Sequence, residues 1–341
     1  MTMKGGKTLS KKKKETDFLS ISARVRVMET RLLTAERMER MIDAKDAAEA
    51  AKVLGECGYP DLAAVTPSAV EDMLTDAQGA LFEDLGKAVD DPPLLDVFRC
   101  KYDYHNAKTL VKAQALGVDQ NRLLLRGGRY DPEKLAEDFH REDLRACTPA
   151  FQEAVAHARE LLGSSGDPQQ ADFVLDRAYY AELAALAKES GSRFLEGYVA
   201  LLIDSANLRS AVRAARLNKG PDFLRLVLVE GGTVPPADIA NTPGPDLARL
   251  FHASPLADAA EAGAALAAPN GGPLTDFERL CDNAVMAYIA QARMIPFGEQ
   301  PVAAYLYARE AEATAIRIIL TGRMAGLDGA TIRQRLRRAY C

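Results

Sequence analysis

One amphipathic helical pattern occurs three times in this 341-residue sequence and constrains the fold more than any other feature. In each copy an apolar or aromatic run leads to an acidic residue, and a basic residue follows five positions later. The three segments are Phe98–Gly117, Gly197–Leu217 and Pro301–Leu327. Their acid and base pairs are Asp103 and Lys108, Asp204 and Arg209, and Glu312 and Arg317. Because self-similarity at a nearly constant spacing marks repeated supersecondary units, we expect three such units in the chain.

Other residues keep their distance from the repeated helix. An aspartate lies roughly one long helix upstream of each acid, at Asp76, Asp176 and Asp282. One position in the repeated helix is occupied by Asn106, Asn207 and Ala315 in turn. Downstream, GGRYDPEKLA from Gly127 matches GGTVPPADIA from Gly231, and GLDGATI from Gly326 is a shorter third version. These matches divide the chain into a basic tail, residues 1–16, and three helical units, 17–117, 118–228 and 229–341.

The composition favours helices with substantial cores. Hydrophobic residues make up 48% of the chain and charged residues 27%, Trp is absent, and the strong helix formers Ala, Leu and Arg are abundant. A capping residue followed by proline, which is a helix-start signal, occurs at Asp131, Thr148 and Asp167. The sequence therefore predicts an all-α fold.

Three further segments bear on the assignment of helices. Apolar residues at helical spacing run from Asp17 to about Met41, which predicts one helix there. The run Leu224–Val229 has strand propensity, but helix is favoured because Pro221 begins a helix-start pattern and nothing nearby offers a strand partner. The Pro- and Ala-rich stretch 242–273 gives the weakest helical pattern of the chain.

The repeated acid and base cannot bind each other as neighbours on one helix. Five residues turn the helix by about 500°, which leaves the two side chains about 140° apart. Both must find partners elsewhere, and the upstream Asp76, Asp176 and Asp282 are candidates. We expect each of these aspartates to lie on a long helix antiparallel to the repeated helix of its own unit. The hypothesis is that a partly buried contact from this Asp to the Lys or Arg joins the two helices of each unit.

The distribution of charge bears on the kind of partner that the chain can bind. A net charge of -5 without a dominant basic surface argues against nucleic acid. The lysines of the tail are consistent with a disordered, solvated segment or with an electrostatic contact to anionic lipid or a partner. The same two alternatives, a solvated face or a contact surface, apply to the arginines of the last helix, Arg333, Arg335, Arg337 and Arg338.

No targeting signal or membrane-spanning apolar run is found, and the five cysteines are scattered singly, so we expect a cytoplasmic protein with reduced thiols.

No constellation for catalysis or ligand binding is visible. The four histidines lack metal-ligand spacing, and there is no GxxxxGK[ST] loop and no GxGxxG after a strand. Repeated acids and bases on helices more often serve packing than acid-base chemistry. The sequence therefore predicts no catalytic, cofactor-binding or metal-binding residues.

Three separated motifs carry a family resemblance. They are FLSISARVRVMETRLL near the start, the helices YDYHNAKTLVKA and LLIDSANLRSAVRAARL, and the closing YAREAEATAIRIILTGRMAGLDGATIRQRLR. In this order they resemble the C subunit of the prokaryotic V-type (A/V-type) rotary ATPase, the counterpart of the d subunit of the eukaryotic V-ATPase. The resemblance runs from about Asp17 to Arg338, while the Lys-rich tail and the stretch 242–273 depart from the family pattern.

The resemblance implies an all-helical, non-catalytic subunit of three pseudo-repeated units, arranged as a funnel around a pseudo-threefold axis. It implies a place in the central stalk, between the shaft, made by the D and F subunits, and the membrane ring of proteolipid subunits, on the cytoplasmic face. We expect a monomer in isolation and no cofactor. The competing hypothesis is a helical-repeat scaffold that binds an unrelated protein partner in its concave face.

Overall fold

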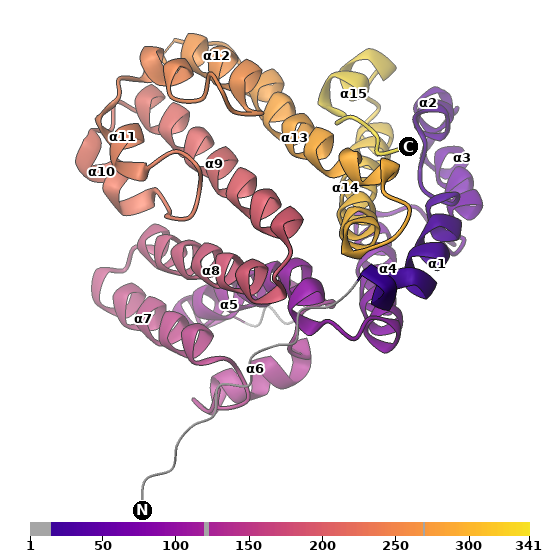
Figure 1. Ribbon diagram of the computed structural model, residues 1–341, viewed down its shortest axis with the longest axis horizontal. Helices are drawn as coiled ribbons and strands as arrows, with labels where there is room; N and C mark the ends of the chain where they lie inside the picture. Colours follow the sequence, from indigo (N-terminus) through magenta and orange to yellow (C-terminus); the bar gives the residue numbers. More distant parts are fainter. Residues whose placement is uncertain (1–14, 119–122, 269) are drawn as a thin grey trace, which may run out of the picture.

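The computed structural model describes residues 15–118, 123–268 and 270–341 (Figure 1). Within these ranges the chain forms helices, turns and irregular segments without a strand, which confirms the all-α prediction. The predicted tail, residues 1–16, lies almost entirely outside the described residues. In Figure 1 the helices from both ends of the chain, α1 to α4 with α14 and α15, lie on one side, and α9 to α12 lie on the other.

Long helices alternate along the chain in pairs, each pair formed by a supporting helix and one of the three repeated helices. The pairs are α4 (Pro67–Ala88) with α5 (Pro92–Leu116), α8 (Pro168–Ser190) with α9 (Arg193–Arg216), and α13 (Thr275–Ala290) with α14 (Glu299–Met324). We call α5, α9 and α14 the anchor helices.

The other elements fill the intervals between these pairs. The first interval holds α6 (Pro132–His140) and α7 (Pro149–Ser165), and the second holds α10 (Pro221–Val227), α11 (Pro236–Asn241), η4 (Gly244–Arg249) and α12 (Ala257–Leu266). The N-terminal elements are η1 (Glu15–Phe18), α1 (Leu19–Glu29), α2 (Ala35–Asp43), α3 (Ala47–Lys52) and η2 (Val53–Cys57). The C-terminal region adds η5 (Gln291–Met294) and α15 (Gly329–Arg335).

The predicted helix starts are confirmed by their capping hydrogen bonds. Asp131, Thr148 and Asp167 each accept a hydrogen bond from a backbone N–H in the first turn, and proline follows each of them. These side chains satisfy N–H groups that have no partner inside the helix. Helix α8 ends at Gly191, whose positive φ of 67° permits the sharp turn into α9.

The single helix predicted from Asp17 to Met41 is wrong. The structure ends α1 at Glu29 and begins α2 at Ala35, where the Thr34 side chain accepts a hydrogen bond from the N–H of Arg37. Apolar spacing continues across this break because both helices bury a face in the interior of the molecule. The helix favoured at Leu224–Val229 is confirmed as far as Val227, and residues 242–273 contain η4 and α12.

The anchor helices and supporting helices contact one another in a closed order: α5, α8, α9, α13, α14, α4 and again α5. Anchor helices and supporting helices therefore alternate around the molecule. The anchor helices also approach each other directly, since the Phe98 and Tyr198 rings stack at 5.5 Å and the Tyr198 and Tyr307 rings meet edge to face at 5.7 Å. These two aromatic contacts join α5, α9 and α14 to one another.

The described residues bury two hydrophobic clusters. The larger extends from α1 through α5, α8, α9 and α13 to the first half of α14. The smaller, which we call the two-ended core, combines α2, α3, η2 and the first half of α4 with the second half of α14 and α15. Ile319, fully buried on α14, thus shares a core with Met41, fully buried on α2. The two ends of the chain together build one part of the molecule.

The two-ended core predicts that both chain ends unfold together. Ile319→Ala should lower the free energy of unfolding by about 2 to 5 kcal/mol, because it leaves a cavity in a packed core. Hydrogen exchange followed by mass spectrometry should then show faster exchange in α2 and α3 as well as in α14. As a control, Leu175→Ala, also fully buried but in the larger cluster, should leave α2 and α3 unchanged. Unaltered protection of α2 and α3 in Ile319→Ala would contradict a shared core.

Candidate functional site

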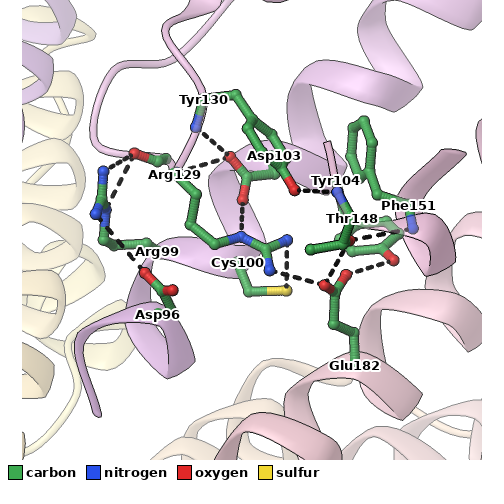
Figure 2. Close-up of polar contacts among 11 residues, drawn as sticks. Asp96, Arg99, Cys100, Asp103, Tyr104, Arg129, Tyr130, Thr148, Phe151 and Glu182 are labelled. Carbon is green, nitrogen blue, oxygen red and sulfur yellow. Dashed lines mark hydrogen bonds and ion pairs between the residues drawn. The ribbon is translucent and has the colours of Figure 1, made fainter. Parts of the chain in front are cut away.

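The acids of the first two anchor helices are buried and bind the chain segment that follows the double glycine. Asp103, with no exposed surface, accepts hydrogen bonds from the backbone N–H groups of Arg129 at 2.9 Å and Tyr130 at 3.3 Å (Figure 2). Asp204 accepts from the N–H groups of Thr233 and Val234, both at 3.1 Å. Each carboxylate therefore fixes the start of the segment that leads into α6 or α11.

The glycines of these segments are required by close approach to the acids. A Cβ atom on Gly128 would overlap the Asp103 carboxylate, and one on Gly232 would overlap that of Asp204. The preceding glycines, Gly127 and Gly231, have positive φ values of 100° and 106°. The repeated GG pair thus combines a turn with a contact that leaves no room for a side chain.

The asparagines three positions after the acids bind a second part of the same segments. Asn106 donates to the carbonyl of Leu125 at 2.9 Å and accepts from its N–H at 2.8 Å. Asn207 makes the same pair of bonds with Val229, at 2.8 and 2.9 Å. Both polar groups of one backbone residue, half-buried Leu125 in one copy and buried Val229 in the other, are satisfied by one amide side chain, so an irregular segment is held without a strand partner.

The third acid binds the beginning of the chain instead. Glu312 accepts hydrogen bonds from the N–H of Leu33 at 2.5 Å, the hydroxyl of Tyr59 at 2.8 Å and the guanidinium of Arg309 at 2.5 Å. Leu33 immediately precedes Thr34, the cap of α2, as the segments bound by Asp103 and Asp204 precede α6 and α11. The N-terminal segment therefore occupies, in the third copy, the place that a downstream segment has in the first two.

The repeated bases bind a supporting helix, but not the one predicted. Lys108 pairs with Asp176 at 2.5 Å, Arg209 with Asp282 at 2.5 Å, and Arg317 with Glu71 at 2.8 Å. The contacts thus join each anchor helix to the supporting helix of the next unit, and the third closes back on α4. The hypothesis of a contact within each unit is wrong, because each base side chain points to the helix packed on its other side.

Asp76, expected as a partner of the first unit, lies 3.6 Å from Arg126 with 68% of its side chain exposed. Glu71, five residues earlier on α4, takes the role instead, because the register between α4 and α14 places it opposite Arg317. Asp176 and Asp282 do bind repeated bases, but each binds the base of the preceding unit and not that of its own unit.

Two of these contacts are extended by a second pair one helical turn away. Lys112 pairs with Asp172 at 2.7 Å, and Arg213 pairs with Glu278 at 2.6 Å. In each case the second base lies four residues after the first base, and the second acid lies four residues before the first acid. This is the pattern expected for two antiparallel helices that pack side by side. Asp282 also accepts from Arg337 at 2.7 Å, so the segment after α15 is attached to α13.

A buried polar network surrounds Asp103 (Figure 2). The Arg129 guanidinium lies between two carboxylates, 2.6 Å from Asp103 and 2.7 Å from Glu182. Glu182, on α8, also accepts from the hydroxyls of Tyr104 at 2.9 Å and Thr148 at 2.8 Å. The network therefore joins α5, the start of α7 and α8 through one cation.

Burial and hydrogen bonding act in opposite directions on these acids. Burial raises the pKa of Asp103 to about 6, although Arg129 lowers it. Burial also acts to raise the pKa of Glu182, but the donors Arg129, Thr148 and Tyr104 hold that pKa below its usual value. The hydrogen bonds from Arg129 therefore favour the ionised form of both carboxylates against burial, and at Glu182 they outweigh it.

The network has no repeated counterpart, and this explains why the sequence does not reveal it. The position of Arg129 is taken by Thr233 in the second copy, where the Thr233 hydroxyl bonds Asp204 at 2.5 Å. Leu33 and Tyr59, the partners of Glu312, likewise lie outside the segments that match between copies. The repeated GG pair, in contrast, is visible in the sequence. A glycine that recurs downstream of a recurring acid indicates that the two residues are in contact.

These side chains bind one another and the backbone, and the arrangement they form is structural. Within the described ranges no cluster of three or more His, Cys, Asp or Glu side chains has the geometry of a metal site. No helix there is long and apolar enough to cross a membrane. The fold and the repeated anchors define a helical-repeat protein in which shared side chains join the units to one another.

The comparisons with known proteins agree with the resemblance found in the sequence. The family described as ATP synthase (C/AC39) subunit matches residues 21–335, and the chain belongs to this family. It is 21% identical over 325 residues to the C subunit of the V-type sodium ATPase of Enterococcus hirae, covering 95% of this chain and 99% of that protein.

Two further relatives carry similar names. The chain is 27% identical over 252 residues to the C subunit of the A-type ATP synthase of Haloferax volcanii, covering 69% of this chain and 71% of that protein. It is 27% identical over 218 residues to the C subunit of the V-type ATP synthase of Thermus thermophilus, covering 60% and 66%. The chain is thus related to the C subunits of both V-type and A-type complexes.

The close approach at the second glycine predicts that Gly232→Ala destabilises the protein by about 1 to 3 kcal/mol, because a methyl group would displace the buried Asp204 carboxylate. Urea unfolding followed by circular dichroism measures this change. Gly163→Ala is the matched control, since a Cβ at this helical position meets nothing within 4 Å. That control should be neutral or stabilising by about 0.5 to 1 kcal/mol. Equal stability of Gly232→Ala and wild type would contradict the close contact.

The cross-unit contacts predict that Arg209→Glu destabilises the whole fold. The new carboxylate would face Asp282 and Glu278, and a loss of about 2 to 4 kcal/mol is expected at a side chain that is 24% exposed. Arg249→Glu, at a side chain 81% exposed, should change stability by less than about 0.5 kcal/mol. If Arg209→Glu melted like wild type yet inactivated the assembled complex, Arg209 would instead be a functional surface residue.

Proposed function

We propose that this chain is a non-catalytic rotor subunit in the central stalk of a V/A-type rotary ATPase. In this role it is a socket that couples the shaft, made by the D and F subunits, to the membrane ring of proteolipid subunits. Torque then passes through it between ATP chemistry and the transport of protons or sodium ions. It lies on the cytoplasmic face of the membrane and is peripheral to it, attached through the ring.

The observation that carries this proposal is the closed order of the long helices, with an ion pair from each anchor helix to the next unit. Lys108, Arg209 and Arg317 make the three pairs, and the third returns to the first unit through Glu71. A closed set of contacts resists twisting better than an open stack, because no unit can rotate without breaking a contact on both sides. This favours the expected funnel around a pseudo-threefold axis.

The buried anchors support a mechanical role for the same reason. Asp103, Asp204 and Glu312 fix irregular segments to rigid helices through charge-assisted hydrogen bonds. Breaking any of these hydrogen bonds would leave a charge buried without its partners, so even a small deformation costs considerable free energy. An adaptor that transmits torque needs this stiffness, whereas an enzyme lid or a flexible binding surface does not.

The test is assembly with the shaft. The purified chain is mixed with the D and F subunits of its own organism, and the mixture is analysed by size-exclusion chromatography with light scattering at low and moderate salt. A complex of one copy of each subunit is expected, beside a monomer when the chain is alone. A second sample adds the detergent-purified proteolipid ring, which should shift the complex to the mass of the ring assembly.

A folded helical monomer that forms no complex with D and F at either salt concentration contradicts the proposal. The alternative, a helical-repeat scaffold for an unrelated partner, would then be favoured. An unrelated helical protein of similar size serves as the control for nonspecific association with the shaft.

A further inference from the structure

Helix α1 carries apolar residues on two opposite faces, and one of these faces is exposed. Ile21 and Val25, at most 4% exposed, pack in the larger hydrophobic cluster. Leu19, Ala23 and Val27 follow one another at intervals of four residues, so they lie along the outward side of the helix. All three are exposed, Leu19 to 47% and Val27 to 66%. The outward face of a surface helix normally carries polar residues, so this apolar stripe needs an explanation.

The loop between α13 and α14 runs beside this stripe. The Ser22 hydroxyl donates to the carbonyl of Gly298 and accepts from its N–H, both at 3.2 Å. Arg26 donates to the carbonyl of Ala292 at 2.9 Å and to that of Ile295 at 2.5 Å. Positions 22 and 26 lie within about 60° of position 19 around the helix axis. The loop is therefore attached to the side of α1 that adjoins the stripe.

This loop extends the exposed apolar surface. Met294 is 88% exposed and Phe297 is 38% exposed. We call these two side chains, together with Leu19, Ala23 and Val27, the α1 patch. Single exposed apolar residues are common, but apolar side chains that gather from two segments of the chain mark an interaction site.

A run of positive charge precedes the α1 patch in the sequence. Residues 1–14 contain Lys4, Lys7 and the four consecutive lysines 11–14, without an acid. Leu19 follows Lys14 by five positions, which is a chain length of at most about 18 Å. The lysines are therefore tethered close to the patch, and the occupant of this surface has to be acidic as well as able to accept apolar side chains.

The described acids beside α1 do not offset this charge, because arginines of the same helix pair with them. Glu29 pairs with Arg26 at 2.7 Å, and Asp84 of α4 pairs with Arg24. Among residues 1–28 the acids are Glu15 and Asp17, against six lysines and two arginines.

An anionic lipid surface meets both requirements better than an acidic protein does. Carboxylates fixed on a protein are best matched by the planar, bidentate guanidinium of arginine. Consecutive lysines suit a continuous negative surface, which attracts them without a fixed geometry. Apolar side chains on one face of a helix enter the boundary between lipid headgroups and acyl chains, and this second contribution turns weak attraction into stable binding.

We propose that the α1 patch and the lysines before it bind a membrane surface that contains anionic lipid. The lysines attract the headgroups, and α1 lies along the surface with the side chains of Val27 and Met294 inserted at headgroup depth. This direct contact with lipid goes beyond the proposed function, in which the chain reaches the membrane through the proteolipid ring.

The first experiment measures cosedimentation of the full chain with vesicles. Vesicles of phosphatidylcholine with about one quarter phosphatidylglycerol should bind the chain, more weakly as salt is raised, and vesicles of phosphatidylcholine alone should bind it at least tenfold more weakly. Combining Lys11→Gln, Lys12→Gln, Lys13→Gln and Lys14→Gln should weaken binding to the anionic vesicles at least tenfold. Combining Val27→Ser and Met294→Ser should weaken it severalfold, with less effect on the salt dependence.

Matched controls separate these effects from changes in total charge and in total apolar surface. The charge control removes four exposed lysines of α3, α4, α6 and α8, and the apolar control removes an exposed leucine at the end of α9. Both should bind the anionic vesicles nearly like wild type, and melting temperatures verify that all variants are folded. These variants are Lys52→Gln, Lys87→Gln, Lys134→Gln and Lys188→Gln combined, and Leu217→Ser.

The second experiment tests insertion of the patch. Trp is absent from the chain, so Met294→Trp introduces a single indole. Its fluorescence should shift to shorter wavelength with the anionic vesicles and should be quenched by brominated lipid. Leu217→Trp, at a leucine that is 67% exposed, is the control and should show neither change.

The outcomes separate this inference from the proposed function, because the vesicle experiments need neither D nor F. A chain that assembles with D and F but does not bind anionic vesicles keeps the proposed function and overturns the inference. Vesicle binding that is unchanged in the lysine variant or in the patch variant also overturns it. If the lysine variant loses binding to D and F while wild type ignores vesicles, the surface binds a protein and not lipid.

Discussion

The structure depends on buried carboxylates that bind backbone N–H groups of a distant segment. Asp103, Asp204 and Glu312 occupy the same position in the three copies of the repeated helix. Each supplies a hydrogen-bond acceptor to backbone N–H groups of an irregular segment that would otherwise have no partner. The asparagines at 106 and 207 complete this function in the first two copies. With these segments fixed, the supporting helices that follow can pack against the anchor helices, and the cross-unit ion pairs can form.

The third copy shows how the closed order is completed. Its acid, Glu312, binds Leu33, and its base, Arg317, binds Glu71. Both partners belong to the N-terminal part of the chain, so the elements that support the last anchor helix come first in the sequence. The two-ended core has the same origin, because α2, α3 and α4 pack on α14 in the way that α6, α7 and α8 pack on α5.

The sequence predicts much of this arrangement and misses one essential part of it. The repeat, the all-α fold, most helix starts and the repeated acids and bases follow from spacing and capping chemistry, which are local. The choice of partner is not local. The spacing of Lys108 or Arg209 from the acid predicts that the base points away from the acid on its own helix, but it does not predict which neighbouring helix the base meets. Glu71 is the acid on α4 that pairs with a repeated base, and Asp76 is not. The register between α4 and α14 decides this, and a register between two packed helices has no signature in the sequence of either helix. Arg129 and Glu182 form their network in one copy alone, so no repeat marks them.

The two-ended core also orders events during synthesis of the chain. The hydrogen bond from Leu33 to Glu312 spans 279 residues, and α2 and α3 cannot complete the burial of their apolar faces until the second half of α14 has left the ribosome. For most of translation these N-terminal helices therefore lack the α14 part of their core, which leaves Met38 and Met41 incompletely covered. Such surfaces are the ones that chaperones bind and that associate wrongly between nascent chains. The stiffness gained by closing the molecule on itself is thus accompanied by a long period in which its first helices need protection.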